Sequence, residues 1–137
     1  MADLSLNVAL VLPVTAGATY KDITAGATIT AGQAVYRDST DSDKAKLADA
    51  NVSAAVADVY GIALHAALAG QPLRVQIGGN ITIGATTANS VIYVLSATAG
   101  GITSDAIASG SYGTIIGIGV SATVIKLIII TSGVALA

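Results

Sequence analysis

Residues 112–131 read Tyr-Gly-Thr-Ile-Ile-Gly-Ile-Gly-Val-Ser-Ala-Thr-Val-Ile-Lys-Leu-Ile-Ile-Ile-Thr, and this stretch decides the fold class. Most of its apolar residues are β-branched, and such residues favour strands. Ser121-Ala122 divides it into two runs, 112–120 and 123–131, so it predicts a hairpin. Residues 127–130 are apolar on both faces, and we expect this part of the second strand to be covered on both sides.

The window 106–125 carries no charge, and its twenty residues match the length of a membrane-spanning helix. It nevertheless contains nine Gly, Ser or Thr residues, and its apolar members are largely β-branched. It therefore predicts strands, and we expect no membrane association.

The N-terminal residues 4–12 alternate with a period of two before Pro13, a pattern that predicts a strand. The residues on one side of this strand are Leu4, Leu6, Val8, Leu10 and Leu12. We treat residues 1–13 as an N-terminal arm or strand and residues 14–137 as a single β-rich domain.

The rest of the chain is a series of short strand-like runs separated by turn residues. Gly78-Gly79-Asn80 is a strong hairpin signal. The single helix candidate is 47–58, where Val52, Val56 and Val59 recur at helical spacing. Other strands are predicted at 33–38, 59–64, 72–77, 81–83 and 91–95. Together these features predict an all-β, mainly antiparallel sandwich or small barrel with one short helix around residues 47–58.

The composition is unusually poor in charge and in aromatic residues for a chain of 137 residues, the length of one domain. Charged residues make up 10%, against about 25% in an average soluble protein. Beyond Arg74 only Asp105 and Lys126 carry charge, which indicates that the C-terminal half is buried inside the domain or at a subunit interface. A net charge of −2, without a basic stripe, argues against direct nucleic-acid binding.

The sequence offers no catalytic constellation, so we assign no catalytic, cofactor-binding or metal-binding residue. His65 is the only histidine, and we interpret it as a surface or hydrogen-bonded residue. The acidic run 38–43 fails the calcium-loop pattern, because its sixth position is Asp43 and its twelfth is Asp49. We interpret this run as a solvated turn, and a weak divalent-ion site is the alternative. The Gly pairs lack the Lys-Ser or Lys-Thr that follows a phosphate-binding loop.

Four phrases of the sequence form an ordered set. In order they are Ile-Thr-Ala-Gly-Gln-Ala-Val-Tyr-Arg-Asp at 29–38, Tyr-Gly-Ile-Ala-Leu-His-Ala-Ala-Leu-Ala-Gly-Gln-Pro at 60–72, Gly-Gly-Asn-Ile-Thr-Ile-Gly at 78–84, and Tyr-Val-Leu-Ser-Ala-Thr-Ala-Gly-Gly-Ile at 93–102. In order and spacing they resemble the capsid cement, or head decoration, proteins of tailed phages. The resemblance spans roughly residues 14–120.

The resemblance implies a non-enzymatic structural protein, made in the host cytoplasm, that sits on the outer surface of the virion shell. Such a protein is expected to form a homotrimer, to bind the major capsid protein and to stabilise the shell by bridging coat subunits. No catalytic residue, cofactor or metal is implied. Two segments are candidates for contact with the shell or between subunits, the strand predicted at 4–12 and the apolar tail 127–136.

Other functions stay open on the sequence alone. A trimeric head-fibre or tail component would share these features but would bind at one vertex or at the tail. A host-glycan binding module would need exposed tyrosines, whereas Tyr36, Tyr60 and Tyr93 fall inside predicted strands. An enzyme is the least favoured class, because no set of residues supplies a mechanism.

Overall fold

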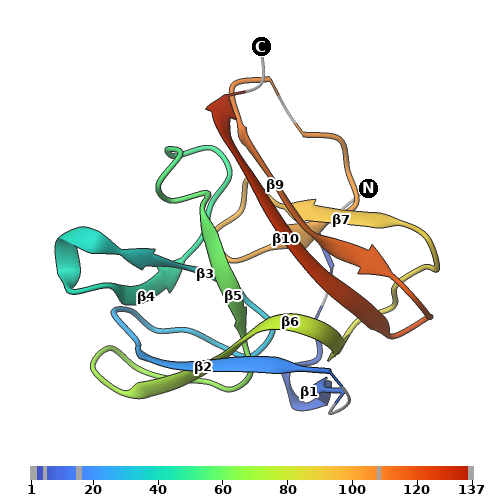
Figure 1. The fold of residues 1–137 in the computed structure, drawn as a ribbon, viewed down its shortest axis with the longest axis horizontal. Coiled ribbons are helices and arrows are strands. Elements are labelled where there is room, and N and C mark those ends of the chain that lie inside the picture. The colour runs from blue at the N-terminus through green and yellow to red at the C-terminus, as the bar shows by residue number, and fades with distance from the viewer. Residues whose placement is uncertain (1–2, 5, 15–16, 108, 136–137) are drawn as a thin grey trace.

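Almost the whole chain is built of β-strands in the computed structural model, which describes residues 3–4, 6–14, 17–107 and 109–135 (Figure 1). Within these residues the strands are β1 (Val11–Pro13), β2 (Thr19–Thr24), β3 (Ala34–Asp38), β4 (Lys44–Leu47), β5 (Val59–Ala63), β6 (Pro72–Ile83), β7 (Ile92–Leu95), β8 (Ile102–Thr103), β9 (Tyr112–Gly119) and β10 (Val124–Ala135). Two single-turn 3-10 helices, η1 (Val8–Leu10) and η2 (Ser39–Asp41), are the only helical segments described.

The strands form one curled sheet that makes a half-barrel, in the order β4-β3-β5-β6-β10-β9-β7-β8. Each pair of neighbouring strands is antiparallel, and β1 and β2 add to β6. The all-β, mainly antiparallel prediction is confirmed. The strands predicted at 33–38, 59–64 and 91–95 are present as β3, β5 and β7, and β9 and β10 form the predicted C-terminal hairpin.

The long strand β6 joins the two halves of the sheet. Its first half pairs with β2 and β5, and its second half pairs with β1 and β10. Gly78 and Gly79 lie between the two halves. The hairpin predicted at this point is therefore wrong: the chain bends and continues, because each half finds partner strands from elsewhere in the sequence.

The bend in β6 depends on glycine and on a buried amide. Gly79 has a φ of +83°, and a Cβ atom there would collide with the backbone of Gly17. Gln76 is fully buried, and its Nε2 donates to Gly78 O (3.0 Å) and to Asn80 O (2.8 Å). One side chain thus supplies donors to carbonyl groups on both sides of the bend.

The helix predicted at 47–58 is wrong, because residues 48–58 form turns and an irregular loop. Their backbone groups are used by other segments: Gly100 N donates to Ala48 O (2.7 Å), and Ala50 N donates to Ser96 O (3.1 Å). Within the loop, side-chain oxygens also accept from the backbone, as when Val56 N donates to Ser53 Oγ (3.2 Å). Such bonds compete with those of a helix.

The strand predicted over 4–12 is mostly wrong, since η1 occupies Val8–Leu10 and only Val11–Pro13 is a strand. Asn7 starts η1, because its Oδ1 accepts from Ala9 N (3.2 Å) and its own N–H donates to Gly84 O (2.6 Å). The 3-10 turn shifts the phase of the alternation. Consequently Val11 is buried, while its neighbours Val8, Leu10 and Leu12 are exposed.

Aliphatic side chains fill two contiguous cores. One, on the concave side of β6, β7, β9 and β10, includes Ile81, Ile116, Ile125 and Leu127, together with the aromatic ring of Tyr93. The other lies among β2 to β6 and contains mainly Val, Ile, Leu and Ala side chains. Together they supply the apolar burial that a chain without Phe or Trp needs to fold.

The substitution Gly79→Ala should lower the free energy of unfolding by about 3 kcal/mol or more, because it adds a steric clash to the strain of a positive φ. Gly70→Ala is the matched control, since Gly70 has a φ of +88° with open space around it. It should cost only about 1–2 kcal/mol. Urea unfolding followed by circular dichroism measures both. Equal costs would show that the close approach to Gly17 does not matter.

Candidate functional site

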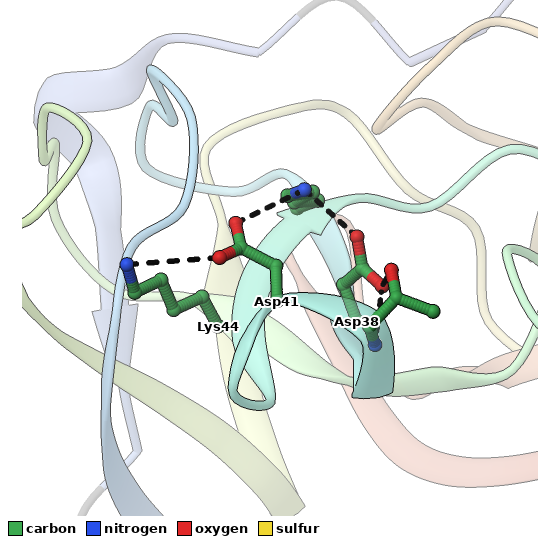
Figure 2. A network of polar contacts seen from close by, with 5 residues as sticks. Asp38, Asp41 and Lys44 are labelled. Atoms are coloured by element: carbon green, nitrogen blue, oxygen red, sulfur yellow. Dashed lines mark hydrogen bonds and ion pairs between the residues drawn. The ribbon is translucent and has the colours of Figure 1, made fainter.

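The acidic run 38–43 folds into η2 and a turn, and lysines contact the carboxylates of Asp38 and Asp41 (Figure 2). Lys46 Nζ lies 2.7 Å from Asp38 Oδ2 and 3.2 Å from Asp41 Oδ2, and Lys44 Nζ lies 3.7 Å from Asp41 Oδ1. Asp38 Oδ1 also accepts from the backbone N–H and the hydroxyl of Thr40. Hydrogen bonds from Lys46 and then Thr40 lower the pKa of Asp38 to about 2.

This network favours a structural role for the run. Cations of the chain itself already engage the carboxylates of Asp38 and Asp41, so a metal ion would have to displace them. Across the described residues, no group of three or more His, Cys, Asp or Glu side chains is placed to hold a metal ion. The arrangement is that of a turn closed by ion pairs.

His65 lies at the surface between β5 and β6. Its Nε2 accepts from Arg74 N (3.1 Å), and its Nδ1 lies 2.9 Å from Ala66 O. Arg74 forms a paired contact with Asp22 on β2, with Nε 2.8 Å from Oδ1. Both ring nitrogens thus contact backbone groups, so His65 holds the loop between β5 and β6 against the start of β6.

An aliphatic surface covers the convex side of β7, β9 and β10. Residues directly opposite each other on antiparallel strands share a face, so Lys126, Ile118 and Ile92 form one row. The register between β10 and β9 shifts between Leu127 and Ile130, but exposure places Ile128 and Ile130 on the same side as Lys126, since all three are exposed while Leu127 is buried. This surface, here called the outer face, consists of Ile92, Ile118, Val124, Lys126, Ile128 and Ile130.

The outer face is apolar and solvent-exposed. Ile92 is 53% exposed, Ile128 43% and Ile130 55%, whereas Ile125 and Leu127, on the other side of β10, are buried in the core. The expectation that residues 127–130 are covered on both sides is therefore wrong within one chain. Antiparallel sheets that face water normally carry polar side chains there, and contiguous apolar surface indicates a contact with another molecule.

A second apolar surface lies at the N-terminal segment. Val8 is 52% exposed, Leu10 54% and Leu12 59%, and these three residues are here called the N-terminal patch. The segment is tied to the body, because Leu4 N donates to Ile102 O (2.8 Å) and Ser96 Oγ donates to Asp3 Oδ1 (2.6 Å). It therefore presents the patch on the surface of the domain.

The tyrosines do not form an exposed binding platform. Tyr36, Tyr60 and Tyr93 lie on β3, β5 and β7, as the sequence predicts, and Tyr93 is buried. Arg37 lies over the ring of Tyr60, 4.2 Å from its centroid. Tyr93 is buried and the other four tyrosines are only partly exposed, which disfavours a stacking site for sugars.

Sequence reasoning found the apolar character of 127–130 but not the outer face. The face also needs Ile92 and Ile118, whose positions beside β10 follow from strand pairing. The described residues include no helix long and apolar enough to cross a membrane. Neither a scan of protein-family models nor a search of curated proteins finds a significant match to this chain. The resemblance to phage cement proteins stays a prediction.

Replacing Lys46 with Met should raise the pKa of Asp38 from about 2 towards 3.8, because its strongest hydrogen-bond donor is lost. Since folding lowers this pKa, the carboxylate stabilises the fold above pH 3.8, and the contribution disappears as the pH falls through about 2. Lys44→Met is the matched control, because Lys44 contacts Asp41 and not Asp38. Carbon-detected NMR titration of the Asp38 carboxyl measures both variants. An unchanged pKa in Lys46→Met would contradict the assignment.

The double variant Ile92→Thr/Ile130→Thr should change the free energy of unfolding by no more than about 0.5 kcal/mol per site, because both side chains are exposed. Ile125→Ala, on the buried side, should cost about 2–5 kcal/mol. Urea unfolding over a dilution series separates chain stability from the effect of association. A large loss in the double variant at low concentration would mean that the outer face belongs to the core.

Proposed function

We propose that this chain is a structural capsid decoration protein that binds the outer surface of an assembled phage shell and bridges coat subunits. The observation that carries the proposal is the pair of exposed aliphatic surfaces, the outer face and the N-terminal patch, on one small domain. A bridging protein needs at least two contact surfaces. The four sequence phrases resemble those of phage cement proteins in order and spacing, and this resemblance is the reason for proposing a phage shell as the partner.

The area of the chain is consistent with this role. Its accessible surface is 6476 Å², and a folded monomer of 13.4 kDa exposes about 6,500 Å² by the usual scaling. A stable protein contact takes about 800 Å² from each partner, roughly an eighth of this surface.

The mechanism is stabilisation by mass action. A protein that binds the assembled shell but not free coat subunits shifts the equilibrium towards the shell. Copies joined to one another bind several coat subunits at once, so individually weak contacts add through their high effective concentration. The homotrimer expected from the resemblance belongs to this proposal, and so does the location on the virion surface.

The N-terminal patch is the proposed shell contact. Deleting residues 1–13 is a poor test, because Val11 is buried and Leu4 and Leu6 pack against the core. A point substitution at an exposed position separates binding from folding. Leu10 is the best choice, since it is 54% exposed and its neighbours Ala9 and Val8 are exposed as well.

Leu10→Asp should abolish decoration of cognate shells, because a carboxylate in an apolar contact loses its hydration. Leu10→Met keeps the contact apolar and should bind like the unaltered chain. Cryo-electron microscopy of shells mixed with each purified chain measures occupancy. Density at the threefold and quasi-threefold positions is expected for the unaltered chain and the Met variant. Density at a single vertex would favour a head-fibre or tail component, and bare shells would overturn the proposal.

A further inference from the structure

Lys126 is the one charged residue on the outer face. It lies opposite Ile118 on β9 and Asn80 on β6, and its side chain is exposed. Within the described part of the chain it forms no ion pair. A partner that covers the outer face must therefore supply a carboxylate at this point, because burying an unpaired ammonium group is costly.

A hollow with the complementary charge lies elsewhere on the same chain. Asp43, Asp58 and Arg37 line it together with Ala55 and Tyr60. Asp58 Oδ1 accepts from Thr131 Oγ1 (3.2 Å), and neither Asp43 nor Asp58 forms an ion pair among the described residues. The three charged side chains leave the hollow with an excess of one negative charge.

The loop 51–58 beside this hollow also carries an exposed apolar residue. Val52 is 59% exposed, and Ala55 next to the hollow is exposed too. The loop thus places exposed apolar side chains beside the carboxylates of Asp43 and Asp58. The outer face combines an aliphatic surface with one ammonium group. The two surfaces therefore match, because each has an apolar part and their charges are opposite.

One chain cannot bring these surfaces together. In Figure 1 the loop before β5 lies on one side of β10, and β9 and β7 lie on the other. We propose that the outer face binds the loop 51–58 of a second copy, with Lys126 seated between Asp43 and Asp58 of that copy. The contact joins two different surfaces, so repeating it builds a ring if the rotation closes. A closed ring of three is the form that the proposed function requires, and the ring size rests on that proposal.

Charge reversal with rescue tests the contact in the full chain. Lys126→Asp and Asp58→Lys should each weaken association by about 30-fold or more, as expected when one partner of a buried charge pair is replaced. The double variant restores opposite charges and should regain most of the association. Lys21→Asp is the control, because Lys21 is exposed on β2 and lies on neither surface, and it should leave association unchanged. Sedimentation equilibrium measures each, and circular dichroism checks folding.

Cysteine cross-linking gives a second readout, since the chain has no cysteine of its own. A mixture of Lys126→Cys and Asp58→Cys chains should form a disulfide-linked heterodimer under mild oxidation, while either variant alone should cross-link far less. A monomeric unaltered chain, unaffected association in both single variants, or no rescue in the double variant would overturn the inference. If Lys126→Asp abolished shell binding without changing association, the outer face would bind the coat, and the inference would be wrong.

These outcomes are separable from those of the proposed function. A chain that associates through Lys126 and Asp58 but never binds shells would uphold this contact and overturn the decoration role. A chain that decorates shells, and whose single variants Lys126→Asp and Asp58→Lys associate as well as the unaltered chain, would do the opposite.

Discussion

The bend of β6 at Gly78 and Gly79 is the constraint on which the rest of the structure depends. It lets one strand belong to both halves of the sheet, so β2 and β5 pair with its first half and β1 and β10 with its second. The buried amide of Gln76 satisfies carbonyl groups on both sides of the bend, and Gly79 provides the positive φ. Because the bend curls the sheet, the aliphatic side chains of both halves can enclose a core without aromatic residues other than tyrosine.

The same curl leaves the convex side of β7, β9 and β10 without a covering layer. In a sandwich, a second sheet would pack there. In this chain Ile92, Ile128 and Ile130 face solvent instead, and the sole charge among them is Lys126. Because only 10% of the residues are charged, few charged side chains are available to surround this apolar surface. Both proposals cover such exposed apolar surface by contact with another protein subunit.

The distribution of charge gives the two proposals a common basis. Nearly all charges lie before residue 75, and many of them neutralise one another locally, as Asp38 and Lys46 or Asp22 and Arg74 do. Asp58 and Lys126 form no ion pair among the described residues, and they lie on separate surfaces of one chain. In the proposed contact between copies, these two charges set register and orientation, which apolar surfaces alone do not.

The sequence by itself determined the strand-rich fold, the C-terminal hairpin and the scarcity of charge that points to subunit contacts, because alternation, β-branching and composition are local properties. It could not decide whether Gly78-Gly79 turns the chain or bends it, since the glycines permit both and only the partners of β6 select one. Nor could it show that 48–58 would give its backbone hydrogen bonds to Ser96 and Gly100 instead of forming a helix. Which isoleucines face solvent was likewise decided by the tertiary structure, because strand pairing from distant parts of the chain sets the face that each side chain occupies.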